Sequence, residues 1–272
     1  MEKARKLTIK VFKILMKPEM RILPGHLAFY LVMTLIPLVA LITTLAAALS
    51  ISMEAVREAI IAYVPTEIAI ILDNVIKGSG INFNIIVFYF SALLLASNGP
   101  NSMINASNEI YKVPPRDILS RRLKAIVMTF ILVGLFLFLL LVPVFGTTLF
   151  EIIKELNGNN TILNIIHEML IVLKYPLILL ILFINIKAMY VIAPDKEIPS
   201  HTTNKGAILT TVGWVLATEI FAFYIERFAT YNLFYGSISN ILVLLLWVYL
   251  LSYIYVLGMV INASDYKEES EE

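Results

Sequence analysis

Residues 125–148 read AIVMTFILVGLFLFLLLVPVFGTT, a stretch without a single charged side chain. About 20 apolar residues are enough for a helix to cross the hydrocarbon core of a bilayer, so this stretch predicts a transmembrane helix. Five further apolar stretches lie near residues 26–49, 83–105, 170–191, 207–229 and 238–261. Hydrophobic residues form 59% of the chain and charged residues 15%, which is more apolar surface than a soluble domain of this size can bury. The predicted fold class is therefore all-α, a polytopic membrane bundle of six transmembrane helices with amphipathic interfacial helices.

The chain divides into three parts. Residues 1–22 carry Lys3, Lys6, Lys10, Lys13 and Lys17 at spacings of three and four, with apolar residues on the opposite face. This pattern predicts a basic amphipathic cytoplasmic helix that binds anionic lipid. A nucleic-acid patch is the alternative, but no aromatic residues are interleaved, so no nucleic-acid partner is expected. Residues 23–264 form the six-span membrane domain, and the acidic residues 265–272 are expected to be a disordered tail.

The distribution of basic residues predicts the orientation. Six spans place both termini on one side, and most of the 21 Lys and Arg residues lie before residue 26, between 105 and 125, or between 192 and 206. The positive-inside rule therefore places both termini in the cytoplasm. On the other side, segments 50–80 and 150–170 repeat apolar residues at helical spacing, which predicts helices on the outer interface.

The second span is interrupted. Residues 81–97 are too few to cross the hydrocarbon comfortably, and Asn98-Gly99-Pro100 follows them before a helical pattern resumes up to Tyr111. Either the helix crosses with a break inside the membrane, or it stops short and the next piece lies near the surface. We favour the broken helix, with Gly99 and Pro100 at the break.

Four amides share one face of the segment that follows the break. They recur at intervals of three, four and three residues, at Asn98, Asn101, Asn105 and Asn108. Placing an amide in hydrocarbon without a hydrogen-bond partner costs roughly several kcal/mol. This stripe must therefore face other helices, water or a ligand. One interpretation is hydrogen bonding between helices. The other is a polar pathway beside a broken helix, of the kind that transporters use.

One carboxyl group stands near the middle of a span. Glu219 interrupts the apolar stretch 207–229, where a charge costs about 2.5 kcal/mol or more unless it is paired, protonated or hydrated. It is therefore a candidate for the same polar pathway. Lys187 is a candidate counter-ion from the preceding span, although its depth near the cytoplasmic end argues against a direct pair.

Several classes of site are not indicated. The chain has no cysteine, and its three histidines are isolated, so no thiolate, metal or redox site is expected. A phosphate-binding loop and a nucleophile elbow are also missing from the sequence. We therefore expect no cofactor, no metal ligand and no catalytic residue, and the chain is predicted not to be an enzyme.

A series of motifs resembles a known family. Their order along the chain is Pro24-Gly25-His26-Leu27-Ala28-Phe29-Tyr30, Thr34-Leu35-Ile36-Pro37-Leu38, Asn108-Glu109-Ile110-Tyr111, Arg116, Arg121-Arg122-Leu123, Tyr190, Ala193-Pro194, Gly206-Ala207, Trp214, Tyr224, Tyr235-Gly236-Ser237, Trp247, Gly258 and Asn262-Ala263. In this order they resemble the YihY/BrkB family of bacterial inner-membrane proteins, over roughly residues 20–264. The resemblance implies a multi-pass protein of the bacterial cytoplasmic membrane. Members have been labelled as ribonuclease BN, as a serum-resistance virulence factor and as a transporter in envelope biogenesis.

The leading hypothesis for function is a transporter or flippase-like protein that moves an amphipathic or lipid-linked envelope component. The asparagine stripe and Glu219 would form its pathway, supported by Lys187, Tyr111, Tyr190, Gly99 and Pro100. The alternative is a membrane scaffold for envelope biogenesis that transports nothing. A nuclease would need clustered carboxylates or histidines, whereas the acids of the cytoplasmic segments, Asp117 and Asp195 among them, are scattered.

Overall fold

The structure is a computed structural model that describes residues 16–48, 54, 85–157, 161–228 and 239–271. These residues form helices joined by short connections, and no strand occurs among them. The helices are α2 (Pro18–Ala48), α5 (Ile85–Ala96), α6 (Asn98–Tyr111), α7 (Ile118–Asn157), α8 (Thr161–Ile192), the 3₁₀ turn η1 (Ser200–Thr203), α9 (Asn204–Phe228) and α11 (Ser239–Glu271). The predicted all-α class is confirmed for this part of the chain.

Helices occupy all six positions at which spans were expected, with α5 and α6 sharing the second. Within the described residues, three segments are long and apolar enough to cross a membrane: Pro18–Val39, Ser200–Ile225 and Ser239–Lys267. A shorter apolar helix spans Pro176–Ile192. Membrane-spanning helices are thus supported, and the full count of six spans stays a prediction.

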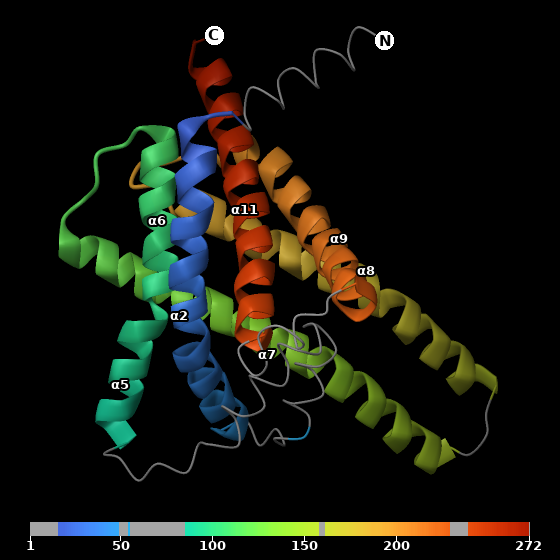
Figure 1. Cartoon of the computed structure of the whole chain (residues 1–272). Helices are drawn as coiled ribbons and strands as arrows, with labels where there is room; N and C mark the ends of the chain where they lie inside the picture. The colour runs from blue at the N-terminus through green and yellow to red at the C-terminus, as the bar shows by residue number, and fades with distance from the viewer. Residues whose placement is uncertain (1–15, 49–53, 55–84, 158–160, 229–238, 272) are drawn as a thin grey trace, which may run out of the picture.

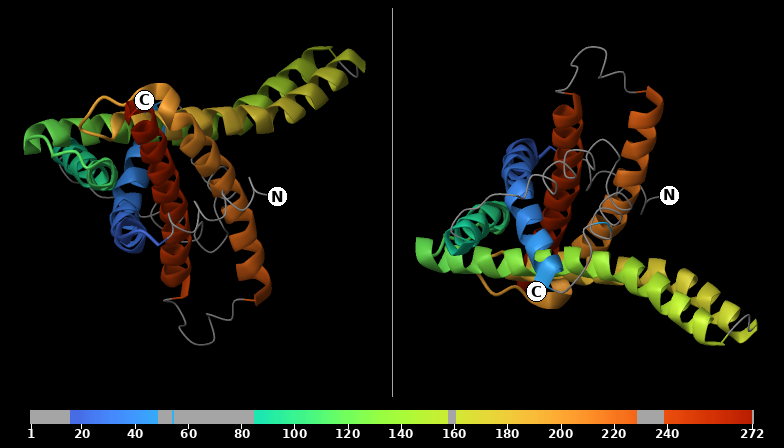
Figure 2. Two further views of the ribbon diagram at one scale, coloured as in Figure 1. Left: turned by 90° about the horizontal axis from the view of Figure 1, so that it is seen from above. Right: turned by 90° about the horizontal axis from the view of Figure 1, so that it is seen from below.

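The helices form a bundle crossed by a long hairpin. Helix α11 packs against α2 and α9, α2 packs against α5 and α6, and α7 packs against α6 and α8. Figures 1 and 2 show the hairpin of α7 and α8 projecting well beyond the other helices. At 40 residues, α7 is about 60 Å long, roughly twice the thickness of the hydrocarbon core. The hairpin must therefore be strongly tilted or extend out of the membrane.

The start of α2 and the end of α11 lie at the same end of the bundle (Figure 1). Contacts between polar side chains tie the segments at this end together. Lys112 pairs with Glu19 at 3.1 Å, and Lys205 pairs with Asp265 at 2.9 Å. The Tyr266 ring packs edge-on against Tyr111, with the ring centroids 6.0 Å apart. We call this end of the bundle the terminal end. Its charged and polar contacts are typical of the end of a membrane bundle that meets water.

A close contact joins α9 to α11. The Gly206 N–H donates to Asn262 Oδ1 at 2.7 Å, and a Cβ on Gly206 would collide with the Gly258 carbonyl oxygen. Tyr190 of α8 closes this contact, because its hydroxyl donates to the Tyr255 carbonyl at 2.7 Å. The absence of a side chain at both glycines thus lets three helices meet at backbone distance.

Helix boundaries differ from the predictions in two places. The expected disordered tail, 265–272, continues α11 as far as Glu271, because Asp265 and Tyr266 are held by the contacts with Lys205 and Tyr111. In the segment 150–170, residues 150–157 and 161–170 extend α7 and α8 and do not form separate interfacial helices, since no glycine or proline lies between Gly146 and Asn157. Residues 1–15, and the segment 50–80 apart from residue 54, lie outside the described residues.

The outside of the bundle is apolar. Large hydrophobic side chains are exposed on α2, α5, α7, α9 and α11, including Ile22, Phe90, Leu119, Ile220 and Ile241. A soluble monomer rarely exposes contiguous apolar patches larger than about a few hundred Å². Lipid is therefore the natural environment of this surface. The composition and the surface of the bundle therefore agree on a membrane protein.

Candidate functional site

The second span breaks at Ser97, where α5 ends and α6 begins. The break packs against α2: the Gly99 N–H donates to Thr34 Oγ1 at 2.9 Å, and the Thr34 hydroxyl donates in turn to the Tyr30 carbonyl. A Cβ on Gly99 would lie only 2.9 Å from Thr34 Oγ1, so a glycine is needed at this approach. Pro100 has no N–H to continue the helical ladder. Gly99 and Pro100 are both buried beside the break, and the position of the break agrees with the sequence prediction.

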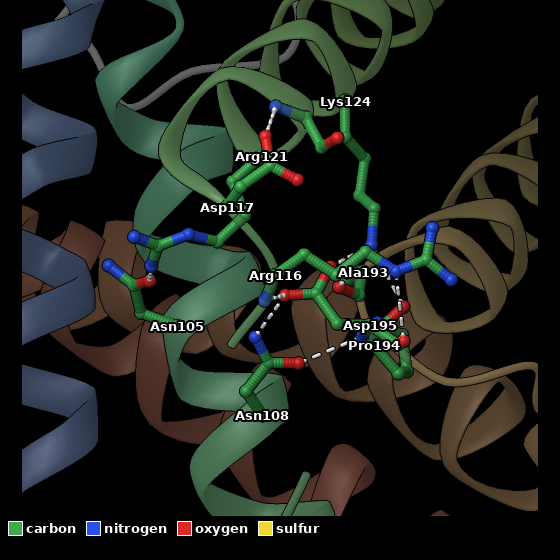
Figure 3. Close-up of polar contacts among 10 residues, drawn as sticks. Asn105, Asn108, Arg116, Asp117, Arg121, Lys124, Ala193, Pro194 and Asp195 are labelled. Carbon is green, nitrogen blue, oxygen red and sulfur yellow. Dashed lines mark hydrogen bonds and ion pairs between the residues drawn. The ribbon is translucent and has the colours of Figure 1, made fainter. Parts of the chain in front are cut away.

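Two of the stripe asparagines accept hydrogen bonds from guanidinium groups of α7. Arg122 Nη1 donates to Asn98 Oδ1 at 2.9 Å, and its Nη2 donates to the Leu94 carbonyl at 2.5 Å. Arg121 Nη1 donates to Asn105 Oδ1 at 3.1 Å (Figure 3). All of these acceptors are neutral. Within the part of the chain that the structure describes, neither arginine forms an ion pair with a carboxylate.

The fourth asparagine of the stripe binds an aspartate from a distant segment. Asn108 Nδ2 donates to Asp195 Oδ2 at 2.6 Å, and the Asp195 N–H donates to Asn108 Oδ1 at 2.8 Å. The Asp195 carboxylate also accepts from Lys124 Nζ at 2.5 Å and from the Arg116 N–H at 3.1 Å (Figure 3). Its side chain is 0% exposed. Asp195 therefore joins α6, α7 and the connections that follow α6 and α8.

Hydrogen bonds keep this buried carboxyl ionised. Burial alone would raise the pKa of Asp195, but the bonds from Lys124, the Arg116 amide and Asn108 outweigh it and hold the pKa below its usual value of 3.8. Lys124 is equally well satisfied, because its ammonium also donates to the carbonyls of Ala193 and Pro194. With every partner in place, this arrangement, called the Asp195 clamp below, acts as a structural fastening.

The sequence pattern of the virulence factor BrkB family matches residues 12–272. The chain belongs to the BrkB family. A protein of Bacillus subtilis that is named as ribonuclease-like, YfkH, is 32% identical over 253 residues, which cover 90% of either chain. Shorter matches include the UPF0761 membrane protein Nmul_A0452 of Nitrosospira multiformis, 38% identical over 30% of this chain and 19% of the relative. Another is the UPF0761 membrane protein IL2447 of Idiomarina loihiensis, 29% identical over 30% of this chain and 29% of the relative. No solved structure matches.

The resemblance to the family noted in the sequence is thus confirmed, and several of the motifs that carry it make the contacts described above. The segment 24–38 lies in α2 and packs against α6, where His26 Nδ1 is 3.2 Å from Ser102 Oγ. Tyr190, Gly206, Gly258 and Asn262 meet in the contact between α8, α9 and α11. These motifs of the BrkB-family chain therefore lie at contacts between its helices.

Other candidate residues do not join the stripe. Asn101 is half-buried on the same face of α6, and no hydrogen bond to its side chain occurs among the described residues. Glu219 is exposed on α9, which packs against α11 and α8, and no ion pair joins it to the half-buried Lys187 in this part of the chain. Tyr111 contacts Tyr266, and the fully buried Tyr190 bonds the Tyr255 carbonyl. The pathway that the sequence predicted from the four asparagines and Glu219 is therefore not assembled as one continuous site.

Sequence reasoning missed the partners of the asparagines. Arg121 and Arg122 entered only as a family motif and as charges that orient the chain, Lys124 only as such a charge, and Asp195 only as one of several scattered acids. The available signal was the stripe itself, because four amides on one face require partners of their own. Among the described residues, no group of three His, Asp or Glu side chains lies close enough to hold a metal ion.

Acid should weaken the Asp195 clamp. Since the folded-state pKa of Asp195 is lowered, the carboxylate stabilises the fold fully above its unfolded pKa and loses that contribution as pH falls through the folded value. We expect the protein to unfold at a higher temperature than Asp195→Asn between about pH 5 and 7, with the difference shrinking below about pH 4. Thermal unfolding in detergent across this range measures it. A constant difference down to pH 3, or an equal effect of Glu197→Gln on the exposed neighbour, would contradict this assignment.

Proposed function

We propose that this BrkB-family protein moves an amphipathic or lipid-linked envelope component across the bacterial cytoplasmic membrane. One observation carries the proposal: two adjacent guanidinium groups lie at the break of the second span and along the helix that follows it, and among the described residues they bind neutral acceptors only. Arg122 binds Asn98 and the Leu94 carbonyl, and Arg121 binds Asn105. We call these four side chains, together with Asn101, the arginine–asparagine cluster.

The chemistry of this cluster suits exchange of partners. A guanidinium offers five N–H donors, and here most of them have no protein acceptor among the described residues. An amide acceptor is weaker than an anion, so an entering anionic group competes well for these donors. The interruption between α5 and α6 at Ser97, followed by Pro100 without an N–H, lies beside the cluster, and interrupted helices form binding sites in transporters. Glu219 stays a separate candidate, since an exposed acid on an apolar helix face needs water, a proton or a partner.

The proposed orientation follows from the charges. With both termini in the cytoplasm, the terminal end of the bundle and its basic residues face the cytoplasmic leaflet. Residues 1–22 would then lie on that leaflet and bind anionic lipid. Lys112, Arg116, Lys196 and Lys205 lie in or beside connections at this end, where the positive-inside rule expects them.

A scaffold without transport activity is the second candidate. The observation in its favour is the Asp195 clamp, which leaves Asn108 with protein partners on both atoms of its amide. Such a fully satisfied network gives a rigid frame for other envelope proteins. This function needs the clamp but not the free donors of Arg121 and Arg122.

Transport in reconstituted vesicles separates these two functions. The purified full chain in liposomes is expected to move a fluorescent phosphatidylglycerol between leaflets, and Arg122→Gln is expected to slow this about tenfold, the effect of losing one charge-assisted contact. Asn101→Leu and Asn105→Leu should slow it less, and Glu219→Gln tests the separate acid. Lys112→Gln is the matched control, because this lysine already pairs with Glu19 and Glu109. A wild-type protein that moves no lipid would favour the scaffold, and equal rates for all variants would exclude the cluster from transport.

A further inference from the structure

We infer that Arg121 and Arg122 bind the phosphate of an anionic phospholipid in the leaflet next to the start of α7. This inference rests on the proposed function and names the class of substrate. The geometry that points to it is a pair of adjacent cations whose charge the protein does not balance, next to exposed apolar side chains of two helices.

Among the described residues, no carboxylate balances the charge of these two adjacent arginines, whereas three lysines are paired with carboxylates. Lys112 pairs with Glu19 and Glu109, Lys124 with Asp195, and Lys205 with Asp265. Arg121 and Arg122 are half-buried, yet within the described residues they contact only amide and carbonyl oxygens. The Arg121 Nε is buried without a partner there. Partly buried cations normally have an anionic partner. Since the described residues supply none for Arg121 and Arg122, we expect the anion to come from another molecule.

The apolar surroundings indicate where the anion comes from. On α7, Leu119 is 70% and Leu123 57% exposed, and they flank the two arginines in sequence. On α5, which packs against α7, Phe90 is 62% and Leu95 56% exposed, and Leu95 follows the carbonyl that Arg122 binds. A soluble phosphate would gain nothing from these side chains, whereas acyl chains would cover them. The anion is therefore the headgroup of a lipid.

Guanidinium chemistry fits a phosphate headgroup. The planar fork of N–H donors binds two phosphate oxygens at once, and arginine is more weakly hydrated than lysine. Asn98 and Asn105 each accept a hydrogen bond from one nitrogen of a guanidinium group. These bonds restrict the rotation of the two groups and leave their other N–H donors available. The half-buried Asn101 lies between them on the same face of α6 and adds an amide that can donate to the headgroup.

An equilibrium binding experiment tests this without requiring transport. The purified full chain in neutral detergent is titrated with phosphatidylglycerol or with phosphatidylcholine, and bound lipid is counted by native mass spectrometry. We expect preferential binding of phosphatidylglycerol, weakened about tenfold or more in the double variant Arg121→Gln/Arg122→Gln. The variant Arg121→Lys/Arg122→Lys keeps the charge but loses the fork, so it should bind with intermediate affinity. Lys112→Gln should stay within about twofold of the wild type.

Each outcome decides the question. Unchanged phosphatidylglycerol affinity in a folded double variant, or an equal loss in Lys112→Gln, would overturn the lipid site. Should the double glutamine variant not fold, wild-type affinity in the double lysine variant would overturn it as well. Displacement of the lipid by millimolar inorganic phosphate would overturn the assignment to a lipid headgroup. Specific binding by a protein that transports nothing would refute the proposed function and leave this site standing.

Discussion

Replacing Asp195 by alanine is expected to lower the free energy of unfolding by about 3–5 kcal/mol, because it leaves a largely buried cation without its partner. Lys124 is only 17% exposed and would lose its counter-ion Asp195. Asn108 and the Arg116 amide would lose an acceptor in the same step. Since these groups come from three separate segments, the connection after α6 and the start of α7 should loosen together. Unfolding by denaturant in mixed micelles, followed by helical circular dichroism, measures the loss.

Two further variants show whether the buried charge is the cause. Glu197→Ala removes an exposed acid two residues away and should change stability little. Asp195→Ala combined with Lys124→Met removes both charges, and it should recover at least about 1–2 kcal/mol relative to Asp195→Ala alone. A loss below about 1 kcal/mol for Asp195→Ala, or no recovery in the double variant, would contradict the Asp195 clamp.

Gly206→Ala is the second variant with a large expected effect, a loss of about 3 kcal/mol in the free energy of unfolding. Its new Cβ would collide with the Gly258 carbonyl oxygen and the Asn262 side chain, and backbone cannot move aside as a flexible side chain does. Helices α9 and α11 would have to separate, which weakens the hydrogen bond between the Gly206 N–H and Asn262. Accessibility of a labelled cysteine introduced at this interface would report the separation.

Gly134→Ala is the matched control for that substitution. Gly134 also lies inside a helix, but nothing stands within 4 Å of the position that a Cβ would take. Alanine favours a helix over glycine by about 0.5–1 kcal/mol, so this variant should be neutral or slightly stabilised. Similar losses at both positions would mean that helix propensity, and not the close contact, decides the effect.

The sequence predicted those features of the fold that depend on local pattern. Apolar stretches marked the six helical positions, and Asn98-Gly99-Pro100 marked the break in the second because glycine and proline act on their own backbone. The spacing of the four asparagines predicted one shared face. Contacts between distant segments left no comparable pattern: Asn108 and Asp195 are 87 residues apart, and Arg122 and Asn98 are 24 apart.

Two individual residues show the same limit. Hydropathy placed Glu219 in the middle of an apolar stretch but could not tell which way α9 turns it, and the side chain proves to be exposed. The acidic composition after residue 264 favoured disorder, yet Asp265 and Tyr266 find partners on other segments and α11 continues. In both cases tertiary packing, which composition does not encode, decides the outcome.

The most direct test of the account is a cryo-electron microscopy structure of the full chain in nanodiscs of phosphatidylglycerol. The expected result is a headgroup within hydrogen-bonding distance of both Arg121 and Arg122, with its acyl chains along the exposed leucines of α5 and α7. Guanidinium groups bound only to Asn98, Asn105 and the Leu94 carbonyl, with every lipid phosphate elsewhere, would contradict it.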